Sequence, residues 1–462
     1  MAFSSSAETA GSILVSYKGL AYAWREDNAF LSRSQAAYAL ERLWERAAGS
    51  LDVGWEGPPA VVFPAITRSQ VEAMLDLAPG ALPWVKLADF LPAGRAVPFD
   101  TGRLPALGLD DKAPVFHYDG ESRFPLDLPA AAFLMLTRWE DTFRPVRDDL
   151  GRPEETAALN IRQRFHDRPI LDEWALLLRV WLQKAQPGWQ PVVPKFRLWL
   201  THDIDHLYCF KSWKNIFRRM ARKFIRERTF GQALKVPVEF FATGRDFKKD
   251  PYYKGALDLM DFDEQLGQRG TFFFMTAQKS FLDDGYDLSI SPYRDLLLAV
   301  SSRGHEIGWH PGFVAAADEA VFAEELERAN KNFGPGRYGA RRHYLAWLGP
   351  RSWRTLEAAG CLYDASLGYN DRTGFRAGTA HPFPAYDLHE ERQLNLLVRP
   401  LIVQDGGLMQ ETSFTFSEGL KKYGLIAGRV KVVGGELSIL IHNGNERLMP
   451  WTKRIIIEGI TT

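Results

Sequence analysis

The apolar positions of the chain follow one pattern before residue 190 and another after it. In the first part, short apolar runs are separated by proline and glycine; Ala60–Phe63 predicts a strand and Asp127–Asp141 predicts a helix. The clearest helix is predicted over Ile170–Lys184, where apolar residues recur at helical spacing: Ile170, Leu171, Trp174, Leu177, Leu178, Trp181 and Leu182. We therefore expect residues 1–190 to form a smaller mixed α/β domain, to which the sequence assigns no role.

The stretch Gln186–Pro194 holds three prolines and a glycine, which predicts a domain boundary near residue 190. Beyond it, short apolar strands alternate with helices. The strands are predicted at Phe196–Thr201, Gly270–Met275, Glu306–Trp309 and Leu437–Ile441, and a helix at Asp318–Phe333. This alternation predicts an α/β fold with a parallel sheet or barrel over residues 191–462. In such folds the chemistry lies at the C-terminal ends of the strands.

The amino-acid composition excludes several classes of protein. The 462 residues are 46% hydrophobic and 25% charged, which excludes a disordered chain or a collagen-like rod. Lys plus Arg and Asp plus Glu are both 57, so a global basic field for nucleic acid is absent and we expect no nucleic-acid partner. The two cysteines, Cys209 and Cys361, do not make a disulfide scaffold. Met1–Ala23 shows no secretory signal and Ala130–Leu136 is too short to cross a bilayer, so we expect a cytoplasmic protein.

The first predicted strand of the second part ends in polar residues, Thr201–His206. Asp203 and Asp205 are two positions apart, so they project to the same face if the strand continues. One carboxylate of such a pair can bind a divalent cation while the other remains free as a base. A solvated turn at the end of the strand is the alternative.

Histidines lie at the ends of two other predicted strands. His305 and His310 flank Glu306–Trp309, and neutral histidine is the commonest metal ligand. His442 follows Leu437–Ile441 at a position suited to a general acid, with a structural histidine as the alternative. Arg341 is a candidate for holding a catalytic carboxylate in place and keeping it ionised. The alternative is that it lies in a basic turn at the surface.

These pieces, in this order, resemble the polysaccharide deacetylases of carbohydrate esterase family 4, the NodB-homology domain, over roughly residues 195–445. The likeness rests on five motifs, which read Thr201-His202-Asp203-Ile204-Asp205, Gly270-Thr271-Phe272-Phe273, Gly304 to His310, Arg341-Arg342-His343-Tyr344 and Leu440-Ile441-His442. The resemblance implies an irregular (β/α) barrel. The first part is similar, through Phe133–Asp141 and Asp167–Ile170, to the region preceding the deacetylase domain in one subgroup.

The resemblance also implies roles for individual residues. Asp203 corresponds to the base that activates water, Arg341 to its tether and His442 to the acid that protonates the departing amine. Asp205 and His310 correspond to ligands of a divalent metal, zinc first and cobalt or another transition metal otherwise. An aspartate that tunes the acidic histidine is expected, and Asp371 is taken as that residue, with Asp364 as the alternative.

The sequence departs from the family pattern at three positions. Ile204 separates the two acids, Val314 stands where the second metal histidine is expected, and His343 replaces the proline of the arginine motif. Asp205 and His310 are then one ligand short of a catalytic zinc site. His305 is the first candidate for the third ligand. His206 and His202 are alternatives, as are weak metal binding and lost catalysis.

The leading hypothesis is a metal-dependent hydrolase that removes N-acetyl groups from a polysaccharide or lipid-linked oligosaccharide in cell-surface glycan biosynthesis. The alternatives are an inactive glycan-binding or scaffold protein on the same barrel and an amidase for a small amide that is not a sugar. Lys211–Arg228 adds a basic amphipathic helix with eight Lys or Arg and one acid. We expect it to rest on an anionic membrane surface, to contact a glycan linked to a lipid pyrophosphate, or to pack on the barrel with a solvated charged face. The oligomeric state is left open.

Overall fold

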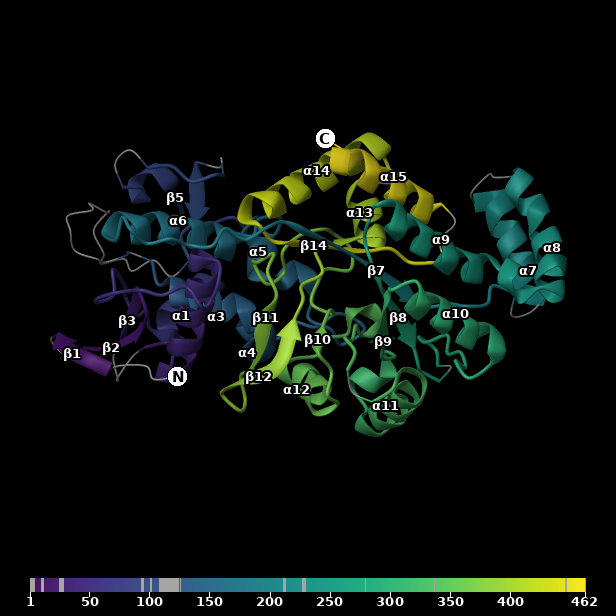
Figure 1. Cartoon of the computed structure of the whole chain (residues 1–462), viewed down its shortest axis with the longest axis horizontal. Helices are drawn as coiled ribbons and strands as arrows, with labels where there is room; N and C mark the ends of the chain where they lie inside the picture. The colour runs from purple at the N-terminus through teal and green to yellow at the C-terminus, as the bar shows by residue number, and fades with distance from the viewer. Residues whose placement is uncertain are drawn as a thin grey trace.

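The N-terminal region contains a four-stranded sheet on which helix α1 packs (Figure 1). The computed structural model describes residues 5–9, 12–24, 29–92, 95–99, 102–107, 124, 126–210, 213–226, 230–278, 280–335, 337–444 and 447–461. The elements of this region are β1 (Ser5–Thr9), β2 (Ser12–Tyr17), β3 (Leu20–Trp24), α1 (Arg33–Ala48), β4 (Val61–Phe63), α2 (Arg68–Leu75), β5 (Trp84–Lys86), η1 (Leu87–Phe90), β6 (Arg103–Pro105), α3 (Leu128–Leu136), α4 (Trp139–Phe143), η2 (Glu155–Ala157), α5 (Leu159–Arg162) and α6 (Ile170–Ala185). The predicted strand at 60–63 and the predicted helix at 170–184 are thereby confirmed.

The predicted helix Asp127–Asp141 is wrong in one respect, because the chain breaks it into α3 and α4. Arg138 between them has left-handed backbone, with φ of 55°. Its buried guanidinium donates to Asp141 Oδ2 at 2.9 Å and to the carbonyl of Arg376 at 2.7 Å. A helical backbone would point this side chain elsewhere, so a buried ion pair overrides the local helical pattern.

The second region is built on a five-stranded parallel sheet in the order β13-β14-β7-β8-β9. Its strands are β7 (Arg197–Ile204), β8 (Thr271–Met275), β9 (Glu306–His310), β13 (Val403–Gln404) and β14 (Glu436–Leu440). The four predicted strands therefore exist, and β7 continues three residues beyond its predicted end. The helices of this region are α9 (Pro251–Gln265), α10 (Ser291–Ser302), α11 (Glu319–Phe333), α12 (Pro350–Ala358), α13 (Asp405–Glu411), α14 (Phe416–Val433) and α15 (Leu448–Thr461), with η4 (Phe247–Lys249), η5 (Val314–Ala316) and η6 (His343–Leu345).

Single bridges extend the parallel sheet beyond β9. Ala340 pairs in parallel with Trp309 on one side and with Asp364 on the other. Asp364 belongs to β10 (Tyr363–Asp364), which joins β12 (Arg392–Val398) and β11 (Phe383–Asp387) in a three-stranded sheet. A parallel sheet with interspersed helices confirms the α/β class, and the barrel stays a prediction.

One apolar cluster spans the two regions, and the parallel sheet of the second region has a further cluster. A cluster of buried side chains runs from the N-terminal helices, through Trp44 and Trp174, to Trp353 and Val398 of the second region. The segment 186–196 carries no helix or strand, as the predicted boundary requires, and Val192 N donates to the carbonyl of Ala48 at 2.8 Å. The division into domains at residue 190 stays a prediction.

Among the described residues, no helix combines the length and the apolar content that spanning a bilayer demands.

Asp172 of α6 joins the two regions through a buried polar contact. It accepts hydrogen bonds from Arg46 Nε at 3.1 Å, Thr379 Oγ1 at 2.7 Å and Ala380 N at 2.7 Å. Asp172→Ala should lower the free energy of unfolding by about 3–5 kcal/mol, because it leaves a buried guanidinium and a buried N–H without their acceptor. Urea denaturation measures this.

Glu72→Ala is the control for Asp172→Ala. It removes the exposed pair between Glu72 and Arg68 on α2 and should cost less than about 1 kcal/mol. Equal losses for the two variants would contradict a structural role for the buried contact.

Candidate active site and metal centre

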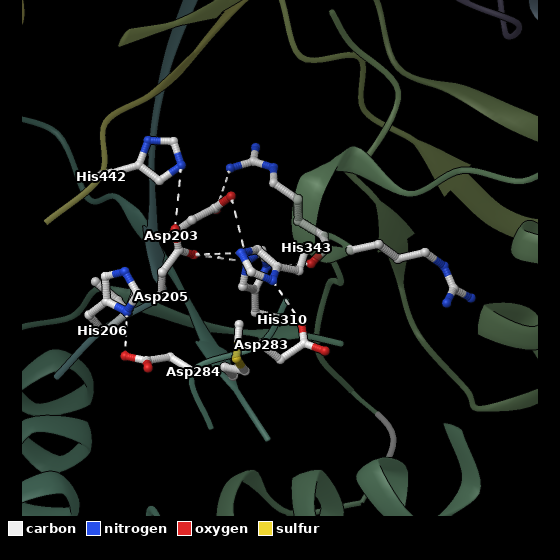
Figure 2. A network of polar contacts seen from close by, with 12 residues as sticks. Asp203, Asp205, His206, Asp283, Asp284, His310, His343 and His442 are labelled. Atoms are coloured by element: carbon white, nitrogen blue, oxygen red, sulfur yellow. Dashed lines mark hydrogen bonds and ion pairs between the residues drawn. The ribbon is translucent and has the colours of Figure 1, made fainter. Parts of the chain in front are cut away.

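The end of β7 supplies the two acids of the site. Asp203 lies in the strand and Asp205 just beyond it, and both approach the ring of His310 (Figure 2). His202, the residue before Asp203 in β7, points the other way. Its Nε2 lies 2.9 Å from Asp263 Oδ2 and its Nδ1 lies 3.2 Å from the carbonyl of Ile441, so it is committed to the core.

Arg341 holds Asp203 in a fixed orientation. Its Nη1 donates to Asp203 Oδ1 at 2.9 Å and to Thr201 Oγ1 at 2.9 Å, and its Nε donates to the carbonyl of Ala365 at 3.0 Å. The guanidinium is fully buried and lies over the ring of Phe273, 4.5 Å from its centroid. With Oδ1 held in this way, Asp203 Oδ2 is left facing the cluster, 4.0 Å from His310 Nε2.

His310 at the end of β9 presents Nε2 to the acids. Its Nδ1 lies 2.6 Å from the carbonyl of Arg341, and because a carbonyl only accepts, Nδ1 carries the proton. His310 Nε2 is 3.2 Å from Asp205 Oδ1, and both atoms are buried without a hydrogen-bond partner among the described residues. Because His310 Nε2 and Asp205 Oδ1 are both acceptors and face each other, a cation that binds both atoms would suit this arrangement.

Without a metal, a proton is the alternative cation. Burial lowers the pKa of His310, but the charges of Asp203 and Asp205 outweigh it and raise the pKa above its usual value. Burial raises the pKa of Asp205, but His310, His442 and His343 hold it well below its usual range. A metal would therefore replace the proton shared by His310 and Asp205.

His343 is the third histidine of the cluster. Its Nε2 lies 3.9 Å from Asp205 Oδ1, and the ligand atoms of Asp205, His310 and His343 all lie within 4.8 Å of one another. Its Nδ1 lies 2.8 Å from Asp283 Oδ1, the carboxylate-to-histidine contact that orients metal-binding histidines. One carboxylate and two imidazoles are a donor set that suits a divalent transition metal with an open position.

His442 approaches the same centre from the end of β14. Its Nε2 lies 3.8 Å from Asp205 Oδ2, and its Nδ1 lies 2.8 Å from Asp405 Oδ1 at the start of α13. Burial lowers the pKa of His442, but Asp405, Asp205 and Asp203 raise it to about 10. In the metal-free protein His442 is therefore a protonated group at neutral pH.

The structure thus brings together Asp203, Asp205, His310, Arg341 and His442, but not the other predicted site residues. The prediction that His305 completes the metal site is wrong: its ring is buried at the N-terminal ends of β8 and β9, where its Nδ1 accepts from Gly270 N at 3.1 Å and its Nε2 lies 3.3 Å from Glu264 Oε1. His305 therefore fixes the start of β8 and is not a metal ligand.

Asp371 and Asp364 are likewise not partners of His442. Asp371 pairs with the neighbouring Arg372 at 2.9 Å, and Asp364 accepts from Trp353 Nε1 at 3.0 Å and from Ser366 N at 3.0 Å. Asp405 has the position expected of the tuning acid, which corrects the assignment of Asp371.

His206 lies at the edge of the cluster (Figure 2). Its Nδ1 is 2.6 Å from Asp284 Oδ2, and its ring stacks on Tyr252 with the side chain 42% exposed. It therefore borders the site rather than completing the metal centre.

The sequence did not identify His343 as a metal-ligand candidate or Asp405 as the partner of His442. His343 was visible as a histidine in the arginine motif, one residue from Arg342, which made it an available signal. Asp405 follows the two-residue strand β13, which is too short to give an apolar pattern, so no sequence signal indicated it.

Comparison with known proteins gives few matches. Residues 84–187 match a family of unknown function, DUF7033. No curated protein matches the chain. Among solved structures, the chain is similar to a Mycobacterium smegmatis protein provisionally assigned as a polysaccharide deacetylase, with 14% identity, a TM-score of 0.37, and coverage of 58% of this chain and 85% of that one.

Removing His343 should weaken metal binding. The purified protein is expected to bind one Zn²⁺ or Co²⁺, and His343→Gln should lower the affinity by more than the roughly 10- to 100-fold typical of an outer partner such as Asp283. Titration calorimetry and metal analysis after dialysis measure this. His389→Gln, at an exposed histidine, should bind like wild type. Equal affinity of all three proteins would contradict the proposed ligand.

The Asp405–His442 pair should make stability depend on pH in the metal-free protein. Because its folded pKa is raised to about 10, His442 stabilises the fold fully below about pH 6.5 and loses that contribution as pH rises toward 10. The free energy of unfolding should fall across this interval, and less so in Asp405→Asn.

An NMR titration of the His442 ring protons tests the same contact directly. The midpoint should lie near 10 in wild type and move down in Asp405→Asn. An unshifted midpoint in the variant would exclude Asp405 as the cause.

Proposed function

We propose that the protein is a metal-dependent hydrolase that removes N-acetyl groups from a carbohydrate. The observation that carries this proposal is the convergence of three metal-ligand candidates with a separately held carboxylate, Asp203, and a separately paired histidine, His442. Hydrolysis of an amide needs these three parts: an electrophile, a base for water and an acid for the departing amine. The order of the five sequence motifs supports the same reaction.

Asp205, His310 and His343 would hold the metal. When bound, a divalent cation supplies Lewis acidity, which polarises the acyl oxygen and makes a water molecule easier to deprotonate. Zinc suits the nitrogen and oxygen donors best, and cobalt is an alternative. His343 would then replace the metal-binding histidine that is missing at Val314, because it provides the second imidazole from another segment.

Asp203 would act as the base. Arg341 occupies its Oδ1 and prevents the carboxylate from rotating, so that Oδ2 faces the space beside His310 and Asp205. A water molecule in that space can give its proton to Oδ2. The buried guanidinium remains paired throughout, so it acts on Asp203 by position.

His442 would act as the acid. Asp405 fixes Nδ1 and leaves Nε2 directed at the centre, where it can donate a proton to the nitrogen of the departing amine. The raised pKa keeps this proton in place until the amine forms. A cation held at Asp205 would offset one of the charges that raise the pKa of His442, while the contact of Nδ1 with Asp405 remains.

The substrate would be an N-acetylated polysaccharide or lipid-linked oligosaccharide of the cell surface. The side chain of His442 is 30% exposed and that of His206 is 42% exposed, so the centre is open to solvent on the side where these two histidines lie. An extended chain can lie across such a rim. An inactive scaffold, by contrast, gives no reason for two separate His–Asp contacts around one metal-ligand cluster.

Asp203→Asn tests the proposal on N-acetylated oligosaccharides with added zinc. Loss of the base should reduce acetate release by about 100- to 10,000-fold, while metal binding stays near that of wild type because Asp203 is not among the ligands. Acetate and free amine are both measured.

Asp371→Asn is the matched control for Asp203→Asn. It makes the same chemical change at a carboxylate outside the cluster and should leave the rate unchanged. A wild-type protein as inert as Asp203→Asn on a broad glycan panel would overturn the catalytic proposal, and release of acyl groups from small amides alone would reassign the substrate.

A further inference from the structure

A helical hairpin is inserted between β7 and α9, at the end of the molecule opposite β1–β3 (Figure 1). It comprises α7 (Trp213–Ala221), the π-helical turn η3 (Arg222–Arg226) and α8 (Phe230–Arg245). Of the predicted basic helix Lys211–Arg228, residues 211–212 and 227–228 lie outside the described residues. The two ends of the insertion are joined, because Cys209 N donates to the carboxylate of Asp250 at 3.0 Å.

The hairpin has a small core of its own. Ile216 of α7 and Val236 of α8 are buried with Cys209 and Phe210, and Met220 and Phe240 pack against them. This is the apolar face that holds the two helices together. Of the apolar residues in the predicted basic helix, Ile216 and Met220 take part in this core, whereas Phe217 and Phe224 are exposed.

A second apolar stripe on α8 faces solvent. Phe230, Leu234, Val238 and Phe241 follow one another at helical spacing, and Leu234 and Val238 are each 68% exposed. Phe217, Phe224 and Ile225 of the preceding turns add exposed apolar side chains. Surface helices of globular proteins bury their apolar stripe, so an additional exposed stripe marks a contact surface.

The same segment carries a local excess of positive charge. Residues 211–249 hold twelve Lys or Arg and three Asp or Glu, in a chain whose net charge is zero. Of the cationic side chains that the structure describes there, Lys235, Arg245, Lys248 and Lys249 are exposed, whereas Arg219 and Lys223 are buried. Exposed apolar side chains and exposed cations on one segment are the combination that binds the surface of an anionic bilayer.

We propose that this hairpin docks on an anionic lipid bilayer, with the α8 stripe in the headgroup boundary and the cations against the phosphates. A nucleic acid would leave the apolar stripe uncovered, and a second copy would bring two cationic segments together. The inference does not depend on the proposed function. It does place the site close to the membrane, because only Leu207 and Tyr208 separate His206 at the site's edge from Cys209 at the root of the hairpin.

Flotation of the full-length protein with vesicles tests the proposal. Binding is expected to vesicles of phosphatidylcholine with about 30% phosphatidylglycerol, little to phosphatidylcholine alone, and less at high salt. The double variant Leu234→Glu, Val238→Glu should reduce the bound fraction by about tenfold or more, because two charges would enter the apolar boundary.

Val193→Glu is the matched control, since Val193 is 71% exposed and lies in the segment between the two regions. It should float like wild type. Binding that is absent from anionic vesicles, or unaffected by the double variant, would overturn the proposal. A dimer in ultracentrifugation that the double variant disperses, without vesicle binding, would assign the stripe to a second copy. Hydrolysis of soluble oligosaccharides should be the same in the double variant and wild type, which separates this test from that of the catalytic proposal.

Discussion

Arg341 is the residue on which the arrangement of the site depends. Its guanidinium fixes Asp203 and Thr201 of β7, and its carbonyl accepts a hydrogen bond from His310 Nδ1–H. One residue therefore sets both the direction of a carboxylate and the tautomer of a histidine. A lysine could not replace it, because a single ammonium lacks the planar set of donors that reaches Ala365 and Asp203 together.

The sequence was most informative where a side chain follows an apolar strand. Asp203, Asp205, His310 and His442 lie at the ends of β7, β9 and β14, and parallel strands bring their carboxyl ends to one edge. It failed where the decisive contact is made between segments without a pattern. His305 and His310 flank the same strand, and the contacts of the His305 ring with Asp263 and Glu264 place it at the opposite end of the sheet.

The N-terminal region is more closely joined to the second region than its sequence indicates. Arg46, Asp172 and Thr379 form a buried contact, and Arg138 reaches the carbonyl of Arg376. The turn from Arg372 to Ala380 is thus held from the N-terminal side. Since Asn370 and Tyr369 in turn bond Gln404, which precedes Asp405, the first region supports the segment that carries the partner of His442.

The second imidazole of the metal centre comes from an irregular turn. His343 begins η6, and the two residues after it, Tyr344 and Leu345, have φ of 57° and 51°, a conformation that costs about 1–2 kcal/mol per residue for a side chain with Cβ. In a pair of histidines spaced along one helix, the scaffold is complete before the ion arrives. Here a ligand stands beside two strained backbone positions, so the affinity for the ion would depend on how firmly the rest of the protein holds that turn. Substitutions that only loosen this turn would then register as a weaker affinity for the ion, although they touch none of its ligands.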